Sequence, residues 1–524
     1  MQTSTIAQNR GKERMSDASW FTRRHAGILL HPTSLPGPGG IGDLGESARR
    51  WIEWLRQAGC GLWQVLPLGP TGYGDSPYQC FSAFAGNPLL ISLEDLVAAG
   101  LLADDELAGS PRFPDDLVKF GEVIRFKDRL LDLAAFHFNA RATTELKLRY
   151  EAFRAEQAGW LEDFALFMAL KRAHADRSWT EWEGELGERK PAALAEARRR
   201  LAAETEGTRV RQFLFFEQWN ALHDLARRTG VRIVGDIPIF VAPDSADVWA
   251  HSRLFHLDSS GRPTVVAGVP PDYFTETGQR WGNPLYRWEV MRQDGYAWWM
   301  GRLRAALSQV DIVRLDHFRG FEAYWEVPAD APTAETGRWV PGPGAGFLEA
   351  VRRELGALPL IAEDLGVITP EVVELREAFD LPGMKVIQFA FDSDADNPFL
   401  PHNYTSNAVV YTGTHDNDTS CGWYASAGEV ERDYCRRYLR CDGEDIAWDL
   451  IRAAWASVAN WAVTPLQDVL SLDSRARMNY PGRSDGNWSW RVRTDELTSE
   501  AAERLRDMSE CYGRLAMTEA GEEE

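Results

Sequence analysis

Short runs of apolar residues, rich in β-branched or large aliphatic side chains and closed by polar residues, Gly or Pro, recur along the chain. Such runs are typical of strands buried on both faces of a parallel sheet. We identify eight, of which the last contains Pro465 and could instead be a loop. The runs are Gly27–His31, Gly61–Leu66, Arg232–Ile237, Asp311–Asp316, Leu358–Glu363, Lys385–Ala390, Val409–His415 and Trp461–Leu466.

Amphipathic stretches with helical spacing, such as Ser47–Ala58 and Glu371–Phe379, lie between most of these runs. This alternation predicts an α/β fold, a (β/α)8 TIM barrel. The long interval Leu93–Gly230 after the second run is rich in Ala, Arg, Leu and Glu and predicts a helical insertion on one barrel loop. A doubly wound sheet would usually need a Gly-rich phosphate turn after its first strand. The segment Gly37–Gly45 contains Pro and Asp and better fits an ordinary loop.

The predicted barrel leaves only the two ends of the chain outside it. We expect a flexible N-terminal segment at 1–22, a catalytic barrel at 23–505 with a mostly helical insertion at about 93–230, and a C-terminal helix end with an acidic tail at 506–524. The polar N-terminus resembles no secretory signal, and no stretch is apolar enough to span a bilayer. These features predict a soluble, cytoplasmic protein without a membrane partner.

Composition narrows the choice of partners. A net charge of −21 and a pI of about 5.0 argue against nucleic acid, which an acidic protein repels. The 21 Trp residues suit stacking on sugar rings, although Trp is also common in protein cores. The six cysteines form no CxxC pair and fit reduced thiols better than a disulfide framework or a zinc site.

Carboxylates stand at the carboxyl ends of four predicted strands: Asp236, Asp316, Glu363 and, just after His415, Asp416. In a barrel, side chains at these strand ends face the same mouth, where catalysis takes place. One such acid alone would most often form a salt bridge or cap a helix. Four like charges at one rim repel each other, so a chemical use for them is the better interpretation. Glycosidic bond cleavage needs one ionised and one protonated carboxylate side by side.

The neighbours of these acids suggest their roles. Arg314 lies two residues before Asp316 on the same strand and therefore projects to the same side, where its charge is predicted to keep Asp316 ionised as a nucleophile. Glu363 has apolar neighbours and nearby carboxylates, which favour the protonated form of a general acid. The adjacent His415 and Asp416 are weak evidence for a metal, and no His/Cys cluster or GxSxG elbow is present.

Three segments resemble specific sequence motifs, which is stronger information than the general pattern of strands and strand-end acids. Arg314–Gly320, Ala362–Gly366 and Gly413–Thr419 closely resemble the catalytic motifs of amylomaltases, the 4-α-glucanotransferases of glycoside hydrolase family 77, which include plant disproportionating enzymes. The resemblance covers roughly residues 23 to 493, and no motif acid departs from it. Further matching segments begin at Leu29, Asp75, Gly235, Val266 and Asn487.

The resemblance implies cytoplasmic maltodextrin metabolism, with maltooligosaccharides and α-1,4-glucans as donor and acceptor and with no metal or organic cofactor. It implies that Asp316 is the nucleophile, Glu363 the general acid/base and Asp416 a transition-state stabiliser that grips sugar hydroxyls. Only the resemblance supports the role of Asp416. The same holds for the supporting positions Asp236, Arg314 and His415. No oligomeric state is predicted.

Retaining chemistry leaves a covalent intermediate that water or a sugar hydroxyl can resolve. The segment Pro270–Tyr286, with the aromatic residues Tyr273, Phe274, Trp281 and Tyr286, could be a lid that excludes water, or its aromatics could only pack the loop onto the barrel. Tyr78 could stack on a donor sugar or be structural. The resemblance favours transfer. The alternatives are a retaining α-glucan hydrolase of the amylase clan and a non-catalytic glucan-binding protein; the presence of all three motif acids argues against the second.

Overall fold

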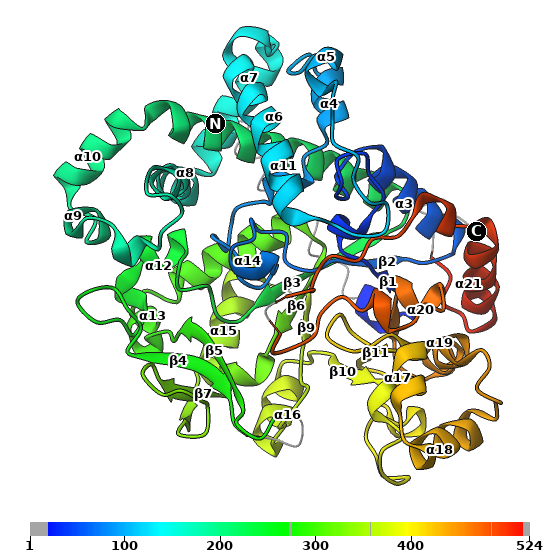
Figure 1. The fold of residues 1–524 in the computed structure, drawn as a ribbon. Coiled ribbons are helices and arrows are strands. Elements are labelled where there is room, and N and C mark those ends of the chain that lie inside the picture. Colours follow the sequence, from blue (N-terminus) through cyan, green and yellow to red (C-terminus); the bar gives the residue numbers. More distant parts are fainter. Residues whose placement is uncertain (1–18, 272–274, 357, 484, 517–524) are drawn as a thin grey trace.

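Eight parallel strands form a nearly closed barrel at the centre of the molecule (Figure 1). The structure, a computed structural model, describes residues 19–271, 275–356, 358–483 and 485–516. Neighbours in the barrel follow the order β10-β11-β12-β1-β2-β3-β6-β9, and the backbone N–H of Ala362 donates to Pro382 O (2.9 Å) across the remaining gap. The strands are β1 (His25–Leu29), β2 (Leu62–Gln64), β3 (Arg232–Pro238), β6 (Ile312–Asp316), β9 (Leu360–Ala362), β10 (Gly383–Val386), β11 (Ala408–Tyr411) and β12 (Trp461–Pro465).

All eight predicted runs contribute a strand to this sheet, so the (β/α)8 prediction is confirmed. Pro465 is tolerated because it is the last residue of β12, where its missing N–H costs little. The run Lys385–Ala390 was placed too far along the chain, because Ile387–Phe389 forms a 3-10 turn. The run Val409–His415 was too long, because β11 ends at Tyr411.

Helices cover the outside of the barrel. In α3, the residues Ala48, Trp51, Ile52 and Leu55 repeat at the spacing of one helix face and are fully buried. The indole of Trp51 also packs against that of Trp63 in β2. The helices outside the long interval between β2 and β3 are α2 (Ser19–Thr22), α3 (Glu46–Gln57), α12 (Ala246–Ala250), α13 (Trp288–Gln293), α14 (Ala297–Gln309), α15 (Gly344–Leu355), α16 (Pro370–Ala378), α17 (Ser420–Ser426), α18 (Glu429–Leu439), α19 (Ile446–Ala456), α20 (Leu466–Val469) and α21 (Ser499–Cys511).

The interval between β2 and β3 is helical and forms the upper part of Figure 1. Its longest helix, α11, returns the chain to β3 and buries Phe213, Phe215 and Trp219. The helices are α4 (Leu93–Ala98), α5 (Asp104–Leu107), α6 (Phe120–Arg141), α7 (Thr144–Glu156), α8 (Ala158–Ala173), α9 (Gly184–Gly187), α10 (Pro191–Arg200) and α11 (Ala202–Arg228).

A second, antiparallel sheet of four strands lies beside the barrel and was not predicted. Its order is β5-β4-β7-β8, with bounds β4 (Val265–Val269), β5 (Gln279–Pro284), β7 (Ala323–Pro328) and β8 (Arg338–Pro341). The segment Pro270–Tyr286 is therefore not simply a loop, because Gln279–Pro284 within it is strand β5, which pairs with β4. Tyr286 is fully buried and cannot face a ligand at the surface. Tyr273 and Phe274 lie outside the described residues.

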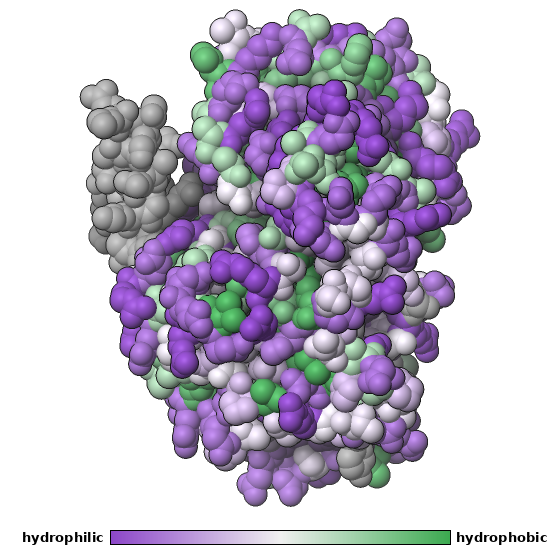
Figure 2. Space-filling view, turned by 90° about the vertical axis from the view of Figure 1, so that its left-hand side faces the viewer, coloured by the Kyte–Doolittle hydropathy of each residue, from purple (hydrophilic) through white to green (hydrophobic). Residues whose placement is uncertain are grey.

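The ends of the chain are described only in part. Of the predicted flexible segment 1–22, residues 1–18 lie outside the described residues and Ser19–Thr22 form α2; of the predicted tail, residues 517–524 lie outside. The predicted boundary after residue 505 falls within α21, which packs against α3. No helix in the described part of the chain is long and apolar enough to cross a membrane. The face drawn in Figure 2 is mostly hydrophilic, with scattered hydrophobic residues, as expected when apolar side chains are gathered in a core.

Candidate active site

Asp236, Arg314 and Asp316 form a charged network at the carboxyl ends of β3 and β6. Asp236 and Arg314 are register partners on these neighbouring strands, so their side chains point the same way. Arg314 Nη1 lies 2.8 Å from both oxygens of Asp236 and 2.9 Å from Oδ1 of Asp316. The predicted approach of Arg314 to Asp316 is confirmed, but the arginine is shared with a second acid.

The buried pair of Asp236 and Arg314 within this network also contributes to stability. The Asp236 side chain has no exposed surface and Arg314 only 5%, whereas Asp316 keeps 28%. Removing one member of a buried ion pair leaves an uncompensated charge and costs about 3–5 kcal/mol. Tyr78 Oη also donates to Asp236 Oδ2 (2.7 Å). Asp316 is thus the network member that faces open space.

Glu363 follows β9 directly and is held by two backbone groups. Its Oε2 accepts from the N–H of His317 (2.6 Å) and its Oε1 from the N–H of Leu365 (2.9 Å). His317 has a left-handed backbone with φ of 53°, an uncommon conformation for a non-glycine residue that often marks functional sites. His317 is the residue directly after Asp316 in the chain, and its backbone N–H binds Glu363. The predicted catalytic pair is therefore linked through this one peptide unit.

Burial raises the pKa of both carboxylates. The pKa of Asp316 rises to about 8, because burial and the charges of Asp236, Glu363 and Asp416 outweigh the arginine. Arg314 lowers the pKa of Asp316, as predicted, but does not offset burial and the three acids, and the ionised state of Asp316 stays a prediction. The pKa of Glu363 is raised as predicted, mainly by burial, although Arg314 and the two backbone N–H groups lower it. The two acids interact, so protons belong to the pair, and the working state of the pair carries one.

The charges around these two acids predict how the catalytic rate depends on pH. Loss of the last proton from the pair should set the basic limb of kcat/KM near pH 8, from the pKa of about 8 at Asp316. Asp236→Asn removes a charge that raises this pKa, so the basic limb should move to lower pH. Asp380→Asn, at the opposite end of the barrel, removes the same charge as a control and should leave the limb in place. An unmoved limb in Asp236→Asn would contradict this account.

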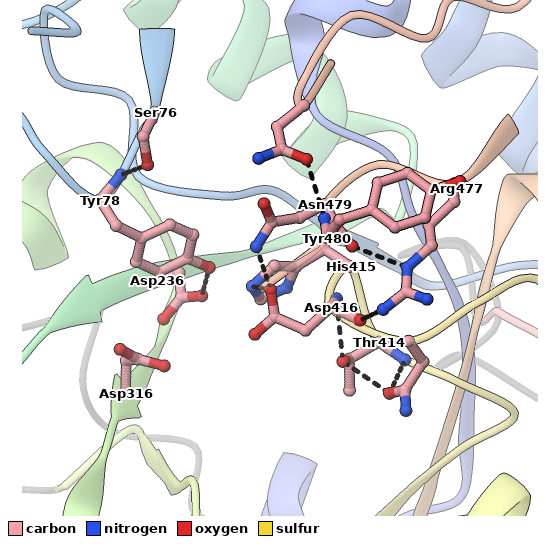
Figure 3. A network of polar contacts seen from close by, with 12 residues as sticks. Ser76, Tyr78, Asp236, Asp316, Thr414, His415, Asp416, Arg477, Asn479 and Tyr480 are labelled. Atoms are coloured by element: carbon pink, nitrogen blue, oxygen red, sulfur yellow. Dashed lines mark hydrogen bonds and ion pairs between the residues drawn. The ribbon is translucent and has the colours of Figure 1, made fainter. Parts of the chain in front are cut away.

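His415 and Asp416 lie on the loop after β11 rather than at a strand end. The Asp416 side chain is 49% exposed, and its Oδ1 accepts from Asn479 Nδ2 (2.6 Å). His415 is buried, which lowers its pKa and keeps the ring neutral. Its Nε2 lies 3.5 Å from Asp416 Oδ1. Figure 3 shows Asp416 on the opposite side of the site from Asp236 and Asp316.

Aromatic rings line the space between these acids. The Tyr78 ring stacks on His415 with 5.1 Å between centroids, and Trp488 lies 5.8 Å from Tyr78 and 6.0 Å from His415. One face of Tyr78 is therefore occupied within the protein. Trp281 of β5 contacts the His317 ring edge-on (4.8 Å), and His317 is the residue that follows Asp316. The structure thus gathers the predicted residues Tyr78, Asp236, Trp281, Arg314 and His415 around the three acids.

Sequence reasoning missed Arg477 and Asn479, which hold Asp416 from a segment 61 and 63 residues further on. No local signal identifies them, because a polar residue in a loop is common. Trp488 lies in a segment that the resemblance included, but no role was predicted for it. Among the described residues, no group of three or more His, Cys, Asp or Glu side chains could hold a metal ion.

A barrel with paired carboxylates at its mouth is typical of a carbohydrate-active (β/α)8 enzyme. The sequence model of the 4-alpha-glucanotransferase family matches residues 30–498. The chain belongs to this family, and it is a glycosyltransferase that acts on glucans.

Known proteins agree over nearly the whole chain. The 4-alpha-glucanotransferase of Thermus thermophilus is 54% identical over 500 residues, which cover 94% of this chain and 99% of the relative. The chloroplastic/amyloplastic 4-alpha-glucanotransferase of Solanum tuberosum is 47% identical over 504 residues, covering 94% and 87%. The amylomaltase of Streptococcus agalactiae, solved in complex with acarbose, superposes with a TM-score of 0.91 at 36% identity and covers 94% of this chain and all of that one.

Proposed function

We propose that the enzyme disproportionates maltooligosaccharides, transferring a segment of an α-1,4-glucan to the 4-hydroxyl of an acceptor glucose or glucan by double displacement. The observation that carries this proposal is the peptide link between Asp316 and Glu363, since His317 N–H binds Glu363 Oε2 at 2.6 Å. Retaining enzymes need their two carboxylates close together, at about 5–5.5 Å, and this link limits their separation.

The proposed steps follow from this arrangement. Asp316, in its ionised form, attacks the anomeric carbon and forms a covalent glycosyl intermediate. Glu363 donates its proton to the glycosidic oxygen as the bond to the leaving sugar breaks. The 4-hydroxyl of the acceptor then attacks the anomeric carbon, gives its proton to Glu363 and displaces Asp316 as a free carboxylate. Asp416, half exposed across the site, accepts hydrogen bonds from hydroxyls of the reacting sugar. No step requires a metal or an organic cofactor.

Further residues support substrate binding in this proposal. Trp281 contacts the ring of His317, the residue after Asp316, and we propose that its indole stacks on a sugar. Tyr78, Asp236, Arg314 and His415 shape other parts of the site. Donor and acceptor are maltooligosaccharides, in line with the acarbose complex of the Streptococcus agalactiae enzyme. We place the enzyme in the cytoplasm.

Incubation with maltotriose tests transfer against hydrolysis. The purified protein, without added metal or cofactor, should give free glucose and a ladder of longer glucans while the number of reducing ends stays constant. A rise in reducing ends at the rate of glucose release would mean hydrolysis and would overturn the proposal. Oligosaccharide sizes and total reducing ends are measured on the same samples.

A further inference from the structure

We propose that Asn479 is a positioning residue that orients the Asp416 carboxylate for the reacting sugar. This inference rests on the role proposed above for Asp416. The Nδ2 of Asn479 donates to Asp416 Oδ1 at 2.6 Å, and the two side chains meet directly in Figure 3. The other carboxylate oxygen makes no such contact among the described residues and is left for a ligand.

The exposure of Asp416 is the reason that it needs an orienting partner. With 49% of its side chain exposed, it lacks the burial and the arginine that fix Asp236. A free aspartate side chain rotates among several rotamers, and a misplaced catalytic group costs rate. The amide of Asn479 restricts this rotation without adding a charge. A lysine in the same place would neutralise Asp416, whereas an amide leaves its charge for the developing positive sugar.

The backbone on both sides of this hydrogen bond is also fixed. Asn479 N–H donates to His415 O (3.1 Å), and Arg477 Nη2 donates to Asp416 O (2.6 Å). Arg477 Nε in turn donates to Asn479 O (2.8 Å). The two segments are therefore bound through main chain and side chain together, so Asn479 is presented to Asp416 in one position.

The opposite side of the Asp416 loop is anchored in the core. The carboxylate of Asp468, only 1% exposed, accepts from Thr412 Oγ1 (2.6 Å) and from the N–H and Oγ of Ser420 (both 2.7 Å). Thr412 and Ser420 bracket the loop that carries Asp416. The loop thus has fixed ends, and the Asp416 side chain is its remaining freedom. Asn479 removes that freedom.

Asn479→Ala should lower kcat by roughly 10- to 100-fold with a much smaller change in KM, as expected for loss of a hydrogen bond to a charged group that acts in the transition state. In the Asp416→Asn background the same change should have almost no further effect. Equal losses in both backgrounds would overturn the proposal, because Asn479 would then act independently of Asp416. Near-normal turnover by Asp416→Asn alone would instead remove the proposed role of Asp416.

Asn479→Asp gives a second signature, which a merely structural role would not produce. Two ionised carboxylates in hydrogen-bond contact repel each other, but one shared proton restores the bond. Activity relative to the unchanged enzyme should therefore rise as the pH falls. The other charged or titratable groups that interact with Asp416 are His415, Arg477, Tyr78 and, across the site, Asp316, and they are the same in both proteins.

The chain supplies a matched control for this variant. Asn407 Nδ2 donates to Asp380 Oδ1 (3.1 Å), an equivalent pair at the opposite end of the barrel. Asn407→Asp should leave the pH profile of activity unchanged, and thermal unfolding confirms that each variant is folded. A constant activity ratio for Asn479→Asp across the pH range would contradict the proposal.

Discussion

Asp316→Asn is expected to lower kcat on maltotriose by roughly 10³- to 10⁶-fold, the usual cost of removing a nucleophile that acts together with its partners. The amide cannot attack the anomeric carbon, yet its oxygen can still accept from Arg314, which now lies 2.9 Å from Asp316 Oδ1. Oligosaccharide binding should persist. Initial rates with maltotriose and calorimetric binding measure the two effects; near-normal turnover would exclude Asp316 from the mechanism.

The same substitution should stabilise the protein, and more so at high pH. The pKa of Asp316 is about 8 in the folded state, whereas an aspartate ordinarily has a pKa of 3.8, so between these two pH values the folded state binds the proton more tightly than the unfolded chain. The wild-type side chain therefore destabilises the fold increasingly from pH 4 to pH 8, by about 1.4 kcal/mol for each pKa unit before solvent and neighbouring charges reduce the effect. Unfolding temperatures should show a larger gain for Asp316→Asn at pH 8 than at pH 5. A gain that does not grow with pH would contradict the electrostatic account.

Glu363→Gln is expected to lower turnover of maltotriose by roughly 10²- to 10⁴-fold, because a sugar leaving group needs a proton. An activated donor such as α-maltosyl fluoride does not need that proton. The first step should therefore proceed, while transfer to the acceptor, which needs the base, becomes slow. A burst of fluoride equal to the enzyme concentration and an added maltosyl mass on the intact protein are the expected results. Equal losses on both donors would exclude this role.

Glu363→Gln should also differ from Asp316→Asn in stability. Each Glu363 oxygen accepts one backbone N–H, so a side-chain amide must turn its NH₂ toward one of these donors. The unpaired, buried N–H costs roughly 1–3 kcal/mol. The unfolding temperature should fall, whereas Glu377→Gln, on the exposed end of α16, should leave it unchanged. Unfolding temperatures of Glu363→Gln, Asp316→Asn and Glu377→Gln, measured at one pH, test this difference in stability.

The sequence predicts the barrel well because its strands are buried on both faces. Such strands are continuous apolar runs, and even Trp461–Leu466 could be placed despite Pro465. The antiparallel sheet β5-β4-β7-β8 was missed for the opposite reason. Its strands are partly exposed, contain Gly and Pro, and pair with segments far away in the chain, as Gly268 does with Trp325. Their residue types do not distinguish them from loops.

The sequence predicts those site residues whose positions follow from a single strand or from the order of the strands in the barrel. Alternation along β6 places Arg314 and Asp316 on one side, and the barrel brings Asp236 beside them. The raised pKa of Asp316 was not predictable, because it depends on burial and on charges contributed by three other segments. Asn479 was not predictable either, since only the folded chain brings it to Asp416.

The left-handed residue His317 limits how this active site can change during evolution. Its N–H binds Glu363, and its own chain position is fixed directly after Asp316. An inverting enzyme needs about 6.5–9.5 Å between its carboxylates to admit a water molecule, and this peptide opposes such a widening. A single insertion at residue 317 would disconnect the pair and inactivate the enzyme before it created a new stereochemistry. Descendants of this protein that lose transferase activity should therefore become retaining hydrolases, through changes around Trp281 and in the part of the site that binds the acceptor sugar.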